Sequence, residues 1–391
     1  MPWESMTVNE ERIRFMLAYR KKVLTERVTM SALCAEFGIS RKTGYKFVAR
    51  LEAEGWRGLV SGKRRPHSGS HWTDPAVCEA IIEVRKREEW GAGKILGYLE
   101  ELEPNIQWPA PSTAHEILRR ANLIPEQTRQ RRWRHPGPPT EVPPDRPNQM
   151  WTTDFKGQFR MGDRRYCYPL TVADSYSRFL LGVDALVQPN FEETWLIFER
   201  LFREYGLPDS IRSDNGSPFA SHAIGRLSKL SVRWVRLGII PDLIQPGHPQ
   251  QNGRHERMHR TLKDRATKPP GANRRDQQKM FDRFRTHYNE VRPHESLGQK
   301  RPTTFYQPSP RPYPKRLPEI VYPETYDVRR VRPNGQIKWN GHLIFVSEVL
   351  AREPVGFQKV AEDSWMVYFG PLVLGYYCER TQKLETDKDP A

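Results

Sequence analysis

Three acidic residues, Asp154, Asp214 and Glu256, stand in segments that suit metal-dependent chemistry. The segments are MWTTDF at 150–155, IRSDNGSPF at 211–219 and GHPQQNGRHERMHRTLK at 247–263. Carboxylate oxygens brought together from separate elements are the hard ligands that Mg²⁺ prefers. Two such ions, about 3.5–4 Å apart, activate an attacking oxygen and stabilise a leaving oxygen at phosphorus. The set therefore predicts phosphodiester chemistry with two Mg²⁺ ions, or Mn²⁺ in their place, and no nucleophilic side chain.

The elements that must position these carboxylates are predicted to be two strands and a helix. Asp154 lies in a short strand, where successive side chains alternate between the two faces. The next strand ends at Asp214, and the Asn-Gly pair after it tolerates a sharp turn. Pro249 suits the first turn of a helix, which would carry Glu256. We expect the three carboxylates to converge from these elements.

At these residues the chain resembles the DDE transposases of bacterial insertion sequences, which are members of the integrase-core (retroviral integrase) superfamily. The resemblance covers residues 145–305 and includes YNEVRPHESL at 288–297, a motif that follows the core in such transposases. It implies an RNase H-like fold, Mg²⁺-dependent cutting of the element's ends, and transfer of the 3′-hydroxyl to target DNA. Asp154, Asp214 and Glu256 would then be both the catalytic residues and the metal ligands.

The predicted third helix also carries cations beside its carboxylate. His259, Arg260 and Lys263 follow Glu256 at offsets of three, four and seven residues, which places them on one helical face. Arg260 and Lys263 are therefore candidates for contacts with DNA phosphates. The alternative is an ordinary ladder of charges four residues apart, worth tenths of a kcal/mol.

Two other patterns compete with the acidic set. Residues 255–259 spell H-E-x-x-H, in which two histidines bind zinc and the glutamate acts as a base. We reject this interpretation because the helix is rich in arginine and because it leaves Asp154 and Asp214 unexplained. Asp174 lies in an Asp-Ser-Tyr-Ser-Arg turn, where aspartate commonly bonds its own backbone. We therefore predict that Asp174 caps the turn and does not bind metal.

The charge of the chain predicts a polyanionic partner. The 391 residues carry a net charge of +16, and the pI is near 9.7. Arginine is spread along the whole sequence, which suits a long footprint on double-stranded DNA better than a patch on a membrane. No apolar run of roughly 18–20 residues indicates a transmembrane helix, and the N-terminus lacks a signal-peptide core. Four widely separated cysteines are typical of reduced thiols. We expect a cytoplasmic protein held at the nucleoid by DNA.

Residues 1–65 are predicted to form a helix-turn-helix DNA-binding domain. Ile13, Met16, Leu17 and Val23 fit a first helix with a period of 3.6 residues. Ser40 is a suitable cap for a later helix, whose first turns would face the major groove. The candidates for DNA contact there are Arg41, Lys42, Thr43, Tyr45 and Lys46. A plain helical hairpin with a polar face is the alternative.

The remainder of the chain divides by composition. Residues 66–124 are predicted to be a second helical module, which either binds DNA or only packs on the first. Residues 125–149 are a linker rich in arginine and proline, in which Arg129, Arg131, Arg132 and Arg134 are candidates for phosphate contacts. The α/β catalytic core with a mixed sheet spans 150–306, and a proline-rich linker spans 307–323. Alternating apolar residues and turns over 324–391 predict a small all-β barrel.

Three functions remain open from the sequence. The first is an active transposase, the second is a catalytically silent DNA-binding regulator derived from one, and the third is a plain RNase H-like nuclease. The intact acidic set favours the transposase, because a regulator needs none of the three carboxylates. Two DNA ends must be brought together in transposition, so we expect a homodimer or larger assembly. The terminal repeats and the target DNA would be its partners.

Overall fold

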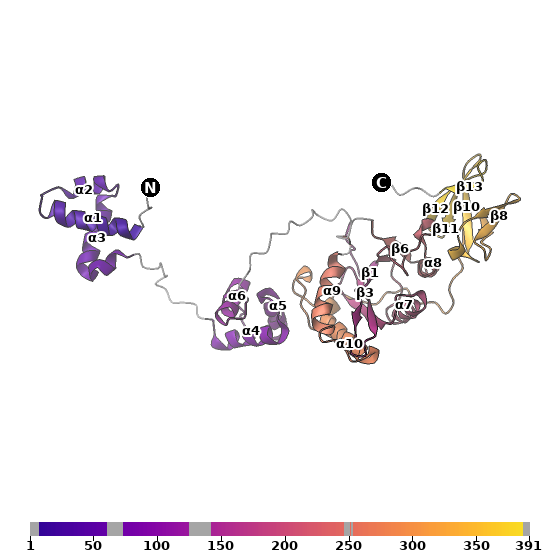
Figure 1. Ribbon diagram of the computed structural model, residues 1–391, viewed down its shortest axis with the longest axis horizontal. Helices are drawn as coiled ribbons and strands as arrows, with labels where there is room; N and C mark the ends of the chain where they lie inside the picture. Colours follow the sequence, from indigo (N-terminus) through magenta and orange to yellow (C-terminus); the bar gives the residue numbers. More distant parts are fainter. Residues whose placement is uncertain (1–7, 61–72, 125–141, 246–250, 252, 386–391) are drawn as a thin grey trace. The chain divides into compact units, whose positions relative to one another are not determined.

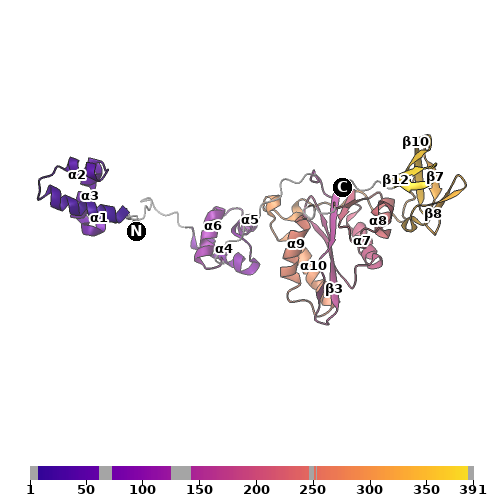
Figure 2. The same ribbon diagram turned by 45° about the horizontal axis from the view of Figure 1, so that its top comes forward.

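The structure is a computed structural model that describes residues 8–60, 73–124, 142–245, 251 and 253–385. Contacts along the chain divide it into two compact units, residues 1–72 and 73–391. Figures 1 and 2 show the helices and strands of the chain in two views. In the described ranges, no helix has both the length and the apolar character that are needed to cross a bilayer.

The first unit is helical. Its elements are α1 (Val8–Ala18), η1 (Tyr19–Val23), α2 (Met30–Glu36), α3 (Arg41–Glu54) and η2 (Gly55–Leu59). Thr29 and Ser40 begin α2 and α3, and each side chain accepts a hydrogen bond from a backbone N–H of the following turn. Gly38, at φ +62°, turns the chain between these two helices. The predicted cap at Ser40 is therefore confirmed.

The apolar period predicted for the first helix is confirmed only in part. Met16 is buried and Val23 packs against the core, whereas Ile13 and Leu17 are 39% and 54% exposed, and Phe15, which the period left out, is buried. Phe15 packs edge-on against Phe37 with ring centroids 5.3 Å apart. The buried set is Phe15, Met16, Met30, Leu33, Cys34, Val48 and Leu59. The inward face of α1 is set by these later helices, which a period read from α1 alone does not reveal.

The second unit begins with three helices, α4 (Pro75–Glu88), α5 (Ala92–Leu102) and α6 (Pro111–Arg120). Asp74 caps α4 by accepting a hydrogen bond from the backbone N–H of Ala76, and Pro75 occupies the first turn. Their shared core contains Ile81, Ile95, Leu99 and Leu118, among other buried residues. Val291, far along the chain, also packs against this core.

A mixed sheet follows. Its strands are β1 (Met150–Phe155), β2 (Phe159–Arg160), β3 (Tyr166–Asp174), β4 (Leu180–Leu186), β5 (Ser210–Ser213) and β6 (Ile240–Leu243). The order is β2-β3-β1-β5-β6, and β4 also pairs with β3. β1 is antiparallel to β3 and parallel to β5, which is itself parallel to β6. The predicted mixed sheet is thereby confirmed.

Two helical layers cover the sheet, and each has its own apolar core. The helices are α7 (Phe191–Tyr205), α8 (Lys229–Arg236), α9 (Gly253–Ala266) and α10 (Arg274–Glu290). Trp151 and Ile211 of the sheet join one core with Phe198 and Trp234 of α7 and α8. The other core contains residues of β3 and β4 together with α9 and α10. The two views agree that α9 and α10 lie on the opposite side of the sheet from α7 and α8 (Figures 1 and 2).

The proline-rich segment 307–323 packs against the end of α7 and the loops that follow α7 and α8. Arg311 donates hydrogen bonds to the carbonyl oxygens of Pro208 and Leu237, both at 2.9 Å. The backbone N–H of Ser309 donates to the carbonyl of Tyr205 at 2.8 Å. The short turns η3 (Ile224–Arg226), η5 (Glu295–Leu297) and η6 (Pro302–Thr304) complete this region.

The C-terminal region is all β apart from one short turn. Its elements are β7 (Asp327–Arg330), β8 (Gln336–Trp339), β9 (His342–Phe345), η7 (Glu348–Leu350), β10 (Pro354–Ala361), β11 (Ser364–Phe369), β12 (Leu372–Cys378) and β13 (Lys383–Glu385). The pairing gives a five-stranded sheet, β13-β12-β11-β10-β7, and a separate hairpin of β8 and β9. Because this sheet does not close in the part of the chain that the structure describes, the predicted barrel is not confirmed. Val232 and Val235 of α8 share the apolar core of this region.

Candidate active site

The first two carboxylates stand at the ends of neighbouring parallel strands. The register of β1 and β5 pairs Met150 with Ser210 and Thr152 with Arg212. Continued for two residues, it brings Asp154 level with Asp214. Side chains two residues apart in a strand share a face, so Asp154 belongs to the face of Thr152, and Asp214 follows directly after β5. In open α/β sheets, ligands bind at such carboxyl ends of strands.

Asp154 is held in a partly buried position among other negative charges. Its side chain is 19% exposed. Burial raises the pKa of its carboxyl from the usual 3.8 to about 7, and the charges of Asp214 and Glu256 add to the rise. Both other predicted carboxylates therefore lie within electrostatic range of Asp154. A cluster of like charges of this kind is relieved by a cation.

Asp214 follows directly after β5 in a tight turn. Its Oδ1 accepts a hydrogen bond from the backbone N–H of Gly216 at 3.1 Å. A Cβ on Gly216 would lie only 3.2 Å from the Asp214 Oδ2, so a glycine leaves room for the carboxylate. Asn215 donates from Nδ2 to the carbonyl of Ile244 at 2.9 Å and ties the turn to the end of β6. The Asn-Gly pair acts here as the sequence predicted.

Glu256 lies in the first turn of α9 and is exposed. Arg260 and Lys263 are exposed on the same helix, whereas His259 is buried. Of the cations expected to share a helical face with Glu256, Arg260 and Lys263 are therefore exposed, and His259 is turned toward the sheet. Pro249, which was expected to begin this helix, lies outside the described residues.

Two histidines and a threonine that sequence reasoning did not assign to the site lie behind Asp154. Thr171 pairs with Asp154 across β1 and β3. Its hydroxyl lies 2.6 Å from Nε2 of His255 and 2.7 Å from Nε2 of His259. Nδ1 of His259 is 3.7 Å from Oδ2 of Asp154. The H-E-x-x-H histidines are thus engaged with a threonine of the sheet, which agrees with the rejection of the zinc interpretation.

The donor chemistry of the carboxylates fits a hard divalent cation, although no complete cage is formed. Among the residues that the structure describes, no three side chains of His, Cys, Asp or Glu stand close enough to hold a metal ion. Asp154, Asp214 and Glu256 nevertheless offer oxygen ligands from three elements, and the pKa of Asp154 is raised first by burial and further by the charges of Asp214 and Glu256. Mg²⁺ keeps several waters and commonly needs only one or two protein carboxylates.

Comparison with known proteins identifies the part of the chain that carries this geometry. A family model described as the integrase core domain matches residues 144–249, and a second with the same description matches 237–302. The first range contains Asp154 and Asp214, and the second contains Glu256. Residues 144–302 therefore match the integrase core domain. A helix-turn-helix domain model also matches residues 11–67.

The proteins that this chain resembles include products of bacterial insertion elements. It is 31% identical over 169 residues to the IS476 uncharacterized 39.2 kDa protein of Xanthomonas euvesicatoria, covering 41% of this chain and 44% of that protein. It is 28% identical over 166 residues to the IS407 uncharacterized 31.7 kDa protein of Burkholderia multivorans, covering 41% and 56%. The chain thus spans about half the length of these relatives. The HTLV-2 integrase catalytic core domain in complex with magnesium matches at 16% identity and a TM-score of 0.33, over 41% of this chain and 98% of that one.

A fourth acidic residue of this region, Asp174, has a structural role. It is buried, and its Oδ1 accepts a hydrogen bond from the backbone N–H of Asn148 at 2.8 Å. Its Oδ2 accepts from the backbone N–H and the hydroxyl of Ser177 at 2.7 and 2.6 Å. The carboxylate caps the turn between β3 and β4, as predicted.

The predicted DNA-contact residues are surface residues where the structure describes them. In α3, Arg41, Lys42, Tyr45 and Lys46 are exposed and Thr43 is partly exposed. Thr43 also hydrogen-bonds to the Ser40 cap, so part of its polar group serves the helix. Arg129, Arg131, Arg132 and Arg134 lie outside the described residues.

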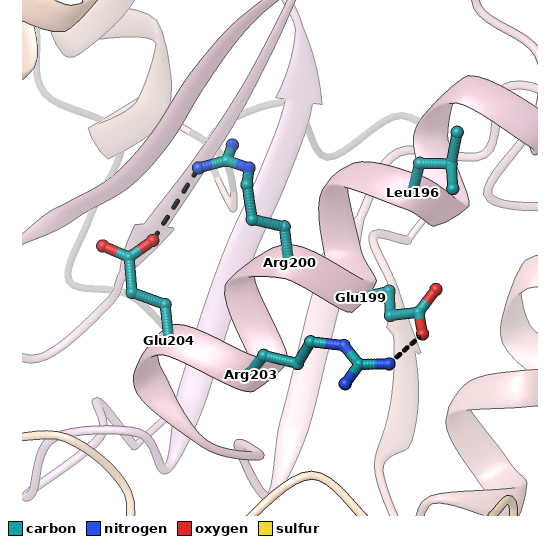
Figure 3. A pocket seen from close by; sticks show the side chains of 5 residues that line it. All are labelled: Leu196, Glu199, Arg200, Arg203 and Glu204. Atoms are coloured by element: carbon teal, nitrogen blue, oxygen red, sulfur yellow. Dashed lines mark hydrogen bonds and ion pairs between the residues drawn. The ribbon is translucent and has the colours of Figure 1, made fainter. Parts of the chain in front are cut away.

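A surface hollow on α7 does not belong to this site. Leu196, Glu199, Arg200, Arg203 and Glu204 line it (Figure 3). Its charges pair along the helix, with Arg203 2.6 Å from Glu199 and Arg200 3.8 Å from Glu204. None of the candidate catalytic residues contributes to it, so we assign it no part in the chemistry.

Proposed function

We propose that this protein is a DDE transposase with an RNase H-like core, which cuts the ends of a mobile element and joins them to target DNA. One observation carries the proposal: Asp154 and Asp214 end neighbouring parallel strands of an integrase core, and Glu256 of α9 lies within electrostatic range. Resemblance to proteins of insertion elements supports the same conclusion. The whole reaction and its substrates go beyond that resemblance and stand as our proposal.

In the proposed reaction, Asp154, Asp214 and Glu256 hold two Mg²⁺ ions, or Mn²⁺ in their place. When bound, such ions lower the pKa of an attacking oxygen's proton and neutralise charge on the leaving oxygen. A water oxygen attacks the phosphorus at the end of the element, and the bond to the 3′ oxygen breaks to leave a 3′-hydroxyl. That hydroxyl then attacks a phosphorus of target DNA and displaces a target 3′ oxygen. The chain's own part is to hold the carboxylates in place beside the DNA.

DNA binding is proposed to involve several parts of the chain. The helix-turn-helix domain, residues 1–65, would present Arg41, Lys42, Tyr45 and Lys46 to a major groove. Residues 66–124 would add a second module, and 125–149 would follow the phosphate backbone. Arg260 and Lys263, exposed beside Glu256, suit phosphates near the reacting bond. Two copies or more would hold two DNA ends together, and the C-terminal β region, proposed as a small barrel over 324–391, would bind DNA or a second copy.

The test is cutting of a labelled linear DNA that carries the inverted repeats flanking the gene. Wild-type protein is expected to nick the ends in Mg²⁺ but not in EDTA. Asp154→Asn, Asp214→Asn and Glu256→Gln are each expected to lose cutting and to keep binding to the ends. Asp264→Asn, an exposed carboxylate on the same helix as Glu256, serves as the matched control and should cut normally.

Each outcome bears on a different part of the proposal. Full cutting by any one of the three acidic variants would remove that residue from the site. Tight binding of the ends by wild-type protein with no cutting in Mg²⁺ or Mn²⁺ would favour the silent regulator. Cutting without any joined product would favour a plain nuclease.

A further inference from the structure

The face of the sheet under α9 carries a polar cluster in a position where a core is usually apolar. Thr171 lies opposite Asp154 in the ladder of β1 and β3, so its side chain shares the face of that carboxylate. His255 and His259 reach this face from α9, which contacts β1. All three residues are buried. Burying hydroxyl and imidazole groups is costly unless each finds a partner.

The hydroxyl of Thr171 has all of its hydrogen-bonding capacity used. It donates to the backbone carbonyl of Asp154 at 3.0 Å. A hydroxyl has one proton and two acceptor sites, so the contacts to Nε2 of His255 and His259 at 2.6 and 2.7 Å must be accepted bonds. This accounting assigns the Nε2–H tautomer to both rings. The two rings stand at 90° to one another with centroids 4.8 Å apart.

The remaining ring nitrogens extend the cluster along β1. Nδ1 of His255 lies 3.1 Å from the hydroxyl of Thr152. That hydroxyl also lies 3.3 Å from the carbonyl oxygen of Ala173, so its single proton serves either the ring or that carbonyl. Nδ1 of His259 lies 3.7 Å from Oδ2 of Asp154, so that ring stands against the side of the carboxylate without a hydrogen bond to it. The cluster therefore touches both the backbone and the side chain of Asp154. It also fastens α9 to β1 at the residue next to Glu256.

Simple core packing does not call for this arrangement, because the neighbouring inward positions of α9 are apolar. Met258 and Leu262 of α9 pack into the same layer with Phe281. Two histidines four residues apart, both meeting one threonine, fix the helix in register and rotation in a way that apolar contacts do not. A fully satisfied polar network adds rigidity of this kind. Residues that lie behind metal-binding side chains commonly hold those side chains in position, and their loss weakens metal affinity about 10–100-fold.

We propose that Thr171, His255 and His259 are positioning residues, which hold Asp154 and the start of α9 at the separation that the divalent ions require. This inference rests on the proposed function, because it takes Asp154 and Glu256 as metal ligands. The three residues touch neither DNA nor the reacting atoms; they act through the carboxylate and the helix that they hold.

The experiment measures Mn²⁺ binding to the full chain by calorimetry, together with the melting temperature without metal. Thr171→Val keeps the shape of the side chain and removes the hydroxyl. It is expected to weaken Mn²⁺ binding at least tenfold, while Thr171→Ser, which restores the hydroxyl, stays within threefold of wild type. Thr153→Val is the matched control: its hydroxyl is buried on the same sheet without a partner, and its removal should leave Mn²⁺ binding unchanged.

A second pair of variants keeps the test valid if Thr171→Val fails to fold. His259→Gln places an amide N–H near the position of Nε2 and should stay within threefold of wild-type affinity, whereas His259→Leu should lose at least tenfold. Wild-type affinity in either Thr171→Val or His259→Leu, even with a lower melting temperature, would overturn the positioning role and leave the proposed function intact. Absence of Mn²⁺ binding by the wild-type protein would overturn both.

Discussion

Replacing Asp154 with asparagine is expected to stabilise the metal-free protein while it abolishes DNA cutting. The substitution keeps the shape of the side chain and removes a charge that is 81% shielded from solvent, the side chain being 19% exposed. That charge sits within range of the charges of Asp214 and Glu256. An arrangement built to hold cations is therefore a source of instability when the cations are absent.

The size of the gain follows from the pKa of Asp154, which burial and the neighbouring charges raise from 3.8 to about 7. One pKa unit corresponds to about 1.4 kcal/mol between the two protonation states. The ionised carboxylate therefore costs the folded protein on the order of 4 kcal/mol above pH 7. Because the folded-state pKa is raised, the cost is nearly absent below pH 4 and grows as the pH rises toward 7.

The assay is thermal unfolding in EDTA at pH 8 and at pH 5. At pH 8, Asp154→Asn should raise the melting temperature of the core by roughly 10 °C, at about 2–4 °C per kcal/mol. At pH 5 the gain should fall to less than about half. Asp264→Asn, which removes an exposed carboxylate of α9, is the control and should shift the temperature little. An Asp154→Asn protein no more stable than wild type at pH 8 would refute the burial of the Asp154 charge beside Asp214 and Glu256.

Three further predictions follow from individual contacts. Burial, aided by nearby positive charges, lowers the pKa of His294 to about 3, so below pH 6.5 the unfolded chain binds a proton that the folded chain does not. The free energy of unfolding should therefore fall by roughly 2 kcal/mol between pH 7 and pH 5 because of this residue. In urea unfolding, His294→Leu should not show this fall of roughly 2 kcal/mol. Arg311→Ala removes hydrogen bonds to the backbone carbonyl of Leu237 and to other backbone carbonyls. It should lower the free energy of unfolding in urea by roughly 2 kcal/mol. An unchanged free energy of unfolding would contradict the packing of segment 307–323 on the core. Finally, the double variant Arg41→Ala and Lys42→Ala should bind the DNA ends more weakly in fluorescence anisotropy. The slope of log affinity against log salt concentration should become shallower by an amount that corresponds to about two phosphate contacts. A slope equal to that of the wild type would exclude both residues from the DNA interface.

Local signals in the sequence predicted local features of the structure. Ser40 caps α3, and Asp174 caps its own turn. Each depends on a side chain and the backbone a few residues away, so the sequence contains the whole interaction. To predict that Asp154 and Asp214 lie side by side, one further assumption was needed, namely that their two strands are neighbours and parallel.

Features that depend on distant partners were not predictable in the same way. Thr171 meets His255 and His259 only through the register of β3 on β1 and the rotation of α9, and neither is encoded within a short window. The i, i+4 spacing of the histidines was visible, but without the sheet it indicated a zinc pattern. Likewise, Ile13 and Leu17 fit a helical period and remain exposed, because the partners of α1 select another face.

The catalytic claim depends most directly on whether joined DNA is formed. The decisive measurement incubates the protein with labelled element ends and a supercoiled target plasmid in Mg²⁺, then sequences the junctions. The account predicts covalent joints between the 3′ end of the element and target DNA, lost in EDTA and in Glu256→Gln. Nicked ends without junctions, or junctions that persist in Glu256→Gln, would contradict it.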